Sequence, residues 1–191
     1  AIMNATFTSG MDSESGLTVR NSGETKIETA KKLGTNKITA ESEFSNVQVS
    51  LAGIYAGTEA NAQSTATSNT YLKAKDHQAN SLLINSDLDS TASAMASSTK
   101  VSISLGVQSV STNAKDTRNL NMYIAGGNTI IGDAVIKATH NADVKSDIDS
   151  FNFGGILGGG QRVRIDAETT ANTTGNIGGN FNANSTNISY T

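Results

Sequence analysis

The chain has 191 residues and a formal net charge of −3, and only 36% of its residues are hydrophobic and 5% aromatic. A globular domain of this length normally anchors its core with several large aromatic residues, but this chain has no tryptophan. Disordered chains combine low hydrophobicity with a high net charge, and the charge here is small. The composition therefore excludes an ordinary aromatic core and argues against disorder. It favours a long hydrogen-bonded β ladder around a narrow aliphatic core.

Proline and cysteine are both absent. At an average usage of about 5%, a chain of this length would contain roughly nine or ten prolines. Proline has no N–H to donate and interrupts a ladder of strands, so its absence is typical of a chain built almost entirely from paired strands. The absence of cysteine excludes a disulfide framework and a thiolate metal site.

Short alternating segments followed by turn residues begin near the N-terminus. They occur at residues 16–23 (GLTVRNSG), 26–30 (KIETA) and 36–40 (NKITA). Their hydrophobic residues Leu17, Ile27 and Ile38 are ten and eleven residues apart. Short strands at such intervals, separated by Gly, Asn and Ser, predict stacked β structure.

Similar alternation recurs at residues 47–54, 100–105 and 162–167. In the second of these segments the pattern predicts that Val101, Ile103 and Leu105 face inwards. Residues 81–98 are the one segment in which leucines and an alanine-rich tail suggest a helix. Their many Ser, Thr and Asn residues favour a strand and a turn instead.

A longer repeat indicates the period of the fold. The segment SDLDS at residues 86–90 recurs as SDIDS at residues 146–150, 60 residues later. Three coils in such a unit give coils of about 20 residues, near the short end of known repeat periods. Roughly nine such coils, with strands about 4.8 Å apart, would form a rod some 45 Å long. The sequence therefore predicts an all-β fold, a parallel β-helix or β-solenoid with roughly 20-residue coils.

The two ends of the chain resemble the middle of this pattern. No basic and apolar signal segment opens the chain, and no run approaches the ~18 apolar residues of a membrane span. Residues 1–191 are therefore interpreted as a single solenoid segment of a longer repetitive chain, with flanking coils as its neighbours.

Residues 16–23, a Leu-Thr-Val strand followed by Asn-Ser-Gly, resemble the repeats of filamentous-haemagglutinin-type adhesins. Residues 129–138 and 149–156 are similar to large repetitive proteins of the leukotoxin and filamentous adhesin kind found in fusobacteria and other diderm bacteria. The resemblance extends over the whole chain and concerns the general character and the period of its repeats. It implies a right-handed parallel β-helix, export by an autotransporter or two-partner system, and a secreted or outer-surface location. It transfers no catalytic residue.

Four aspartates are the candidate metal ligands: Asp87, Asp89, Asp147 and Asp149. Residues i and i+2 on a strand share a face, and Ca²⁺ prefers oxygen ligands. A 60-residue repeat would leave two coils between the two pairs, on the order of 14 Å, which is too far for a shared ion. We therefore interpret the aspartates as a solvated outer face, with the hydrophobic residue inside each pair buried, and expect no cofactor.

His77 and His140 are the two histidines, and they occur in similar phrases, HQAN and HNA. Such a pair suggests a metal site or a general base. No cysteine or close carboxylate lies at ligand spacing, so a repeated surface position is the favoured interpretation.

The pattern and the resemblance together predict a non-enzymatic, structural and adhesive segment that contacts a host-cell surface protein or glycan. One alternative is a fragment of a leukotoxin that acts on host cells. A second is a β-helix carbohydrate-active enzyme, which would need Asp or Glu, Arg and Lys to converge in a groove. A sequence pI of about 5.3 argues against a nucleic-acid surface.

Overall fold

The computed structural model describes residues 1–12, 18–29, 37–50, 54–102, 106–153 and 159–191. Its strands are β1 (Ile2–Asp12), β2 (Thr18–Arg20), β3 (Glu24–Thr29), β4 (Lys37–Ser50), β5 (Ile54–Ser102), β6 (Gly106–Phe153), β7 (Gly159–Ile177) and β8 (Asn180–Tyr190). They form one eight-stranded sheet in which every described pairing is parallel. The predicted all-β, parallel-strand fold is confirmed, and the arrangement is consistent with a β-solenoid. Nowhere in the described part of the chain is there a helix long and apolar enough to cross a membrane.

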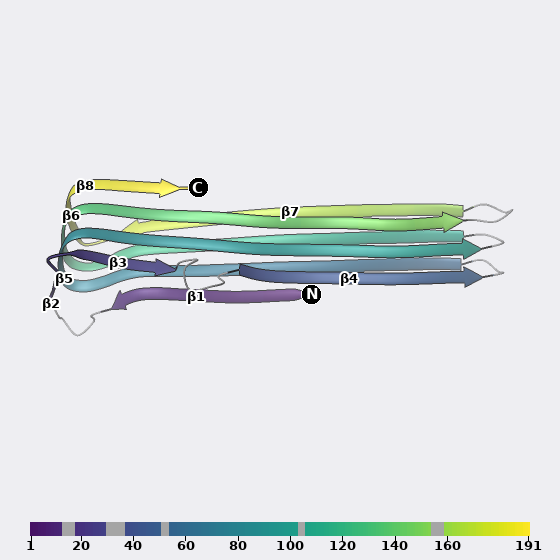
Figure 1. The fold of residues 1–191 in the computed structure, drawn as a ribbon, viewed down its shortest axis with the longest axis horizontal. Coiled ribbons are helices and arrows are strands. Elements are labelled where there is room, and N and C mark those ends of the chain that lie inside the picture. The colour runs from purple at the N-terminus through teal and green to yellow at the C-terminus, as the bar shows by residue number, and fades with distance from the viewer. Residues whose placement is uncertain (13–17, 30–36, 51–53, 103–105, 154–158) are drawn as a thin grey trace.

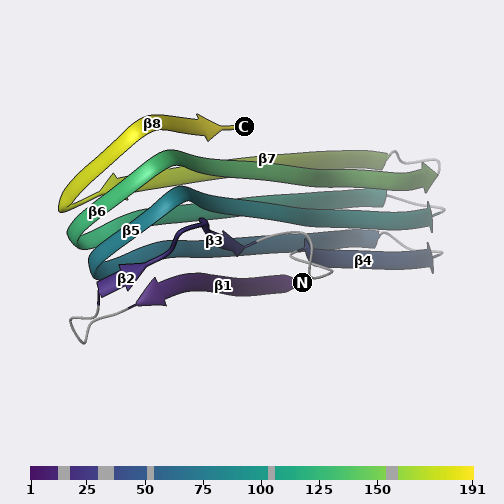
Figure 2. The ribbon, with the colours of Figure 1, turned by 60° about the vertical axis from the view of Figure 1, so that its left-hand side comes forward.

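The longest strands, β5 and β6, have 49 and 48 residues and are bent. Figures 1 and 2 show each of them running along the molecule, turning back at one end and returning beside its neighbour. Each therefore supplies two limbs. In β5 the first limb is residues 54–74 and the second limb is residues 81–102, and the limbs of β6 are formed by their register partners. β1 and β7 extend the first limbs, whereas β3 and β4 extend the second limb of β5.

The register between layers differs from the expected period. Every described pair between β5 and β6 joins residues 52 positions apart, and β6 pairs with β7 at an offset of 53. These offsets are longer than the roughly 20-residue coil that the sequence predicts, and that coil is close to the length of one limb. The two SDLDS-like segments are not register partners either, since Asp87 pairs with Thr139 and Asp147 with Met95. The early strands β2, β3 and β4 succeed one another along β5 and do not stack on each other; Leu17 lies outside the described residues.

Side chains alternate between the inside and the outside along both limbs. In β5 alternate residues are buried from Thr58 to Ala74 and from Leu82 to Lys100, and Thr91 is an additional buried position. This period of two is that of a strand, so the strand interpretation of residues 81–98 is confirmed. The predicted inward position of Val101 is wrong by one residue, because Lys100 is buried and Val101 is half-buried. Ile103 and Leu105 lie outside the described residues.

The buried hydrophobic residues between the limbs are aliphatic, as the composition indicated, and they lie among buried polar side chains, many of them serine and threonine. Near the bend the interior contains leucines and isoleucines, including the register partners Ile27, Ile84 and Ile136, and Ile188 on β8 continues this isoleucine column but is 63% exposed. Farther along the limbs the buried hydrophobic residues are mainly alanines, such as Ala62, Ala94 and Ala114. Small side chains let the two limbs lie close together, so the long ladder needs no aromatic core.

Polar and aromatic ladders run across the layers on the outside. Asn128 Nδ2 donates to Asp76 Oδ1 at 3.0 Å, and Asn180 Nδ2 donates to Asn128 Oδ1 at 3.0 Å. The rings of Tyr71 and Tyr123 stack with centroids 5.1 Å apart and planes 7° apart. Parallel in-register stacking brings equivalent side chains together in this way, as it does in cross-β structure.

Glycine at position 126 is required by the turn between the limbs. Gly126 has a φ of 121°, and a Cβ at this position would lie 1.9 Å from the carbonyl oxygen of Ala74. We expect Gly126→Ala to lower the free energy of unfolding by about 1–3 kcal/mol, because the backbone conformation is strained for an L residue. Urea unfolding followed by circular dichroism measures the change. Gly57→Ala is the matched control, since nothing lies within 4 Å of its Cβ position; an equal loss in both variants would contradict the prediction.

Candidate functional site

A cluster of polar side chains lies inside the stack. Asp116 and Arg118 are two positions apart on β6, face inwards and are 0% and 5% exposed. Arg118 Nε lies 2.8 Å from Asp116 Oδ2, but the geometry of this contact is not that of a hydrogen bond, so both carboxylate oxygens lack a donor within the described residues. Arg118 Nη2 donates to Thr169 Oγ1 at 2.8 Å. A fully buried ion pair cannot reach a substrate and acts within the fold.

His140 is half-buried and interacts electrostatically with this pair. Its Nε2 lies 2.8 Å from Thr173 Oγ1, and its ring meets that of Tyr190 edge-on at 6.4 Å. Burial lowers the pKa of His140, and the positive charge of Arg118 lowers it further, while Asp116 opposes both effects. The imidazole is therefore neutral near pH 7, and its contact with Thr173 lies on the exposed side of the residue.

His77 lies at the bend and is 1% exposed, with its Nε2 3.0 Å from Thr25 Oγ1. Burial lowers the pKa of His77. The two histidines are not equivalent, because His77 pairs with Thr129 and His140 pairs with Leu88. Their interpretation as a repeated surface position is therefore wrong. The sequence could not show this, since the two phrases are 63 residues apart and the register is 52.

Acidification is expected to destabilise the fold through these histidines. Because the pKa of each is lower in the folded chain than the ordinary 6.5, the unfolded state binds more protons below that value. The free energy of unfolding should therefore fall as the pH drops from about 7.5 to about 5. Urea unfolding at both pH values measures this, and His77→Gln should show a smaller fall. An unchanged pH dependence in this variant would contradict a role for His77.

The candidate metal ligands do not come together. Asp147 pairs with Met95, which lies eight positions along β5 from Asp87. That separation along a strand corresponds to about 26 Å. Asp89 accepts a hydrogen bond from Asn141 Nδ2 at 2.7 Å on the outer face. Among the described residues, no group of three or more His, Asp or Glu side chains could hold a metal ion. Leu88, between the first pair, is fully buried as expected.

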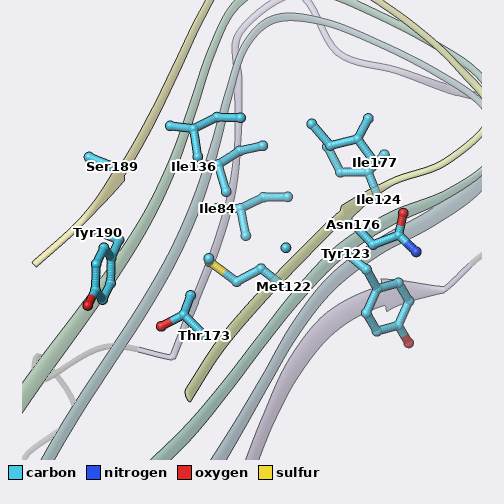
Figure 3. Close-up of a pocket in the computed structure, with 12 residues that line it drawn as sticks. Ile84, Met122, Tyr123, Ile124, Ile136, Thr173, Asn176, Ile177, Ser189 and Tyr190 are labelled. Atoms are coloured by element: carbon cyan, nitrogen blue, oxygen red, sulfur yellow. The ribbon is translucent and has the colours of Figure 1, made fainter. Parts of the chain in front are cut away.

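An apolar pocket of about 340 Å³ lies where the interior meets β7 and β8. Figure 3 shows Ile84, Ile124 and Ile136 around this space, with Tyr190 at its side. Three of the pocket's isoleucines, Ile84, Ile136 and Ile188, belong to the isoleucine column. The pocket is thus a continuation of the interior between the limbs.

The outer side of the first limb carries a regular array of uncharged polar residues. On β5 and β6 its members are Thr65, Thr67, Asn69, Thr117, Asn119 and Asn121. Their register partners on β1 and β7 are Asn4, Thr6, Thr8, Thr170, Asn172 and Thr174. We call these twelve positions, all threonine or asparagine, the threonine–asparagine face.

Side-chain ladders hold this face in a fixed arrangement. Asn121 Nδ2 donates to Asn69 Oδ1 at 3.0 Å, and Asn172 Nδ2 donates to Asn119 Oδ1 at 2.9 Å. The threonines are β-branched and therefore stiff at χ1. Each asparagine amide used in a ladder keeps further donor or acceptor capacity for a ligand. The face is thus an ordered lattice of hydroxyl and amide groups.

Sequence reasoning missed both the interior cluster and the threonine–asparagine face. A signal for the face exists at the 52-residue offset, where Asn69 and Asn121 are identical, as are Tyr71 and Tyr123. The buried Asp116 gives no such signal, because its register partner in β5 is Ser64.

Comparison with known proteins identifies no relative of the chain. No family model matches the chain, and no curated protein or solved structure matches it. Inferences about function therefore depend on the geometry of the described residues.

Proposed function

We propose that the chain is a non-enzymatic, structural and adhesive segment, displayed outside a bacterial cell, whose outer faces contact a host-cell surface. The observation that carries the proposal is the threonine–asparagine face. In-register stacking repeats one uncharged polar surface on four strands, which gives many equivalent contact groups in one plane. Repeated groups favour avidity for a repetitive partner.

The proposed architecture is a β-solenoid in which one turn spans the offset between paired strands. Each turn would comprise two limbs and the bend between them. A right-handed winding agrees with the strong general preference of parallel crossover connections. This architecture replaces the shorter coils that the sequence predicts.

The burial of Asp116 and Arg118 supports a role without catalysis for this pair. A catalytic site needs an acid or base that reaches a bound substrate. Asp116 and Arg118 lie side by side inside the stack and are almost fully buried. The apolar pocket beside β8 is lined by five isoleucines and Met122 together with uncharged polar residues, two tyrosines and a glycine, and no charged residue is among those that line it.

A cell-binding assay with the fluorescently labelled chain tests the proposal. We expect saturable binding to host epithelial cells and leukocytes, without release of cytosolic enzymes. Thr67→Glu, on the threonine–asparagine face, should weaken binding, whereas Thr99→Glu, on the outer side of the second limb, should not. These variants carry the same added charge.

Each other outcome has a distinct meaning. Lysis of leukocytes would overturn the adhesive role in favour of a leukotoxin fragment. Turnover of an acidic polysaccharide would overturn the proposal that the chain is not an enzyme. Absence of binding to any host cell would overturn the adhesive role itself.

A further inference from the structure

We propose that the threonine–asparagine face binds an extended, neutral polysaccharide whose chain runs across the strands, with one sugar unit over each layer. This inference rests on the proposed adhesive function and names the ligand class for it. The groups that would bind are the outward hydroxyls and amides of β1, β5, β6 and β7.

The spacing of the face fits a repeating polymer. Equivalent side chains recur about 4.8 Å apart across the strands, and alternate residues recur about 6.7 Å apart along each strand. A hexopyranose unit in an extended β-linked chain is about as long as the distance between neighbouring strands. Successive sugars would therefore meet equivalent side chains in successive layers.

The face is preorganised for this contact. The ladders Asn69–Asn121 and Asn119–Asn172 run across the strands, in the direction proposed for the polymer. Because these amides are already fixed, little side-chain entropy is lost on binding. Hydroxyls and amides both donate and accept hydrogen bonds, so they match the hydroxyl groups of a sugar.

The charge around the face favours a neutral ligand. None of the twelve positions is charged, and the flanking lysines are ion-paired. Lys115 Nζ lies 3.2 Å from Glu168 Oε2, and Lys73 Nζ lies 3.7 Å from Asp12 Oδ2. Sulfated or carboxylated glycans are typically held by charge-assisted contacts from arginine or lysine, and the face has no arginine.

The stacked pair Tyr71–Tyr123 borders the face. These tyrosines are at the next outward-facing positions along β5 and β6 after Asn69 and Asn121. Tyrosine combines an apolar ring with a hydroxyl, and both rings are half-buried. They would add contacts to the C–H groups of a sugar at the edge of the face.

The test uses binding of the full chain to microcrystalline cellulose, chitin and mannan, with the matching hexasaccharides in solution. The face variant carries Thr65→Val, Thr67→Val and Thr117→Val, which remove hydroxyls and keep the β-branched shape. The control variant carries Thr99→Val and Thr139→Val on the outer side of the second limb. Circular dichroism checks that both variants fold.

We expect binding to at least one polysaccharide, stronger for the polymer than for its hexasaccharide, and at least a tenfold loss in the face variant alone. Retained binding in the face variant would overturn the assignment of the site. Absence of polysaccharide binding by the unaltered chain would overturn the ligand class, and the cell assay would show separately whether the adhesive role survives. Freezing-point depression without polysaccharide binding would assign the face to ice and overturn the proposal.

Discussion

Replacing Arg118 with methionine is expected to lower the free energy of unfolding by about 3–5 kcal/mol, because it leaves a buried charge without its partner. Asp116 is 0% exposed, and Arg118 is its ion-pair partner at 2.8 Å. Methionine has a similar length and fits an apolar interior, so loss of the charge is the main change. Urea unfolding of the folded variant at neutral pH measures the loss.

A double variant separates charge from packing. Asp116→Leu combined with Arg118→Met removes both buried charges, and replacement of a buried ion pair by hydrophobic residues is often neutral or stabilising. The double variant should therefore recover most of the stability that Arg118→Met loses. If the single variant is as stable as the unaltered chain, the charged pair is not buried as described. If the double variant stays as unstable as the single one, packing is the cause.

Truncation of the isoleucine column is expected to have the second large effect. Ile84 is 1% exposed and pairs with Ile27 and Ile136 in the neighbouring layers. Ile84→Ala should cost about 2–5 kcal/mol, because it removes buried methyl groups and leaves a cavity between the limbs. The midpoint of urea unfolding measures the change.

Ile130 provides the matched control for this prediction. Its side chain is on the outer side of the bend and is 51% exposed. Ile130→Ala should therefore change the free energy of unfolding by no more than about 0.5 kcal/mol. A larger loss for Ile130→Ala than for Ile84→Ala would contradict the assigned inner and outer sides of the stack near the bend.

The all-β fold could be predicted from the sequence because several local properties agree. The absence of proline removes the main obstacle to a long ladder, and the alternation of residues 81–98 has the period of a strand. The narrow aliphatic interior follows from the scarcity of aromatic residues. These properties act within a few residues, so no knowledge of the register was needed.

The register could not be predicted in the same way, because it depends on which distant strands pair. The SDLDS and SDIDS segments are alike over five residues, but the pairing places Asp87 beside Thr139. The identities at an offset of 52 are single residues such as Asn69 with Asn121, and they are separated by unlike neighbours. A strand also reverses its inward and outward residues when its alternation is misread by one position, as happened at Val101 and Lys100.

The candidate site depended on the register, and most of it could not be predicted. The candidate metal ligands Asp87 and Asp147 are 60 residues apart and the two histidines are 63 apart, whereas the register of β5 and β6 is 52. The threonine–asparagine face emerges only when β1, β5, β6 and β7 are placed side by side. Asp116 and Arg118 look like ordinary surface charges in the sequence, and only the facing limb shows that they are buried.

Disulfide cross-linking tests the parallel register of β5 and β6 most directly, since the chain has no native cysteine. Asn61 and Asn113 are exposed register partners on these strands, and parallel partners lie within the Cα separation that a disulfide requires. A chain with Asn61→Cys and Asn113→Cys should form an intramolecular disulfide under mild oxidation. A chain with Asn61→Cys and Ser81→Cys, which are one predicted coil apart along the sequence, should not. Efficient cross-linking of the second pair and none of the first would contradict the stacked-limb architecture.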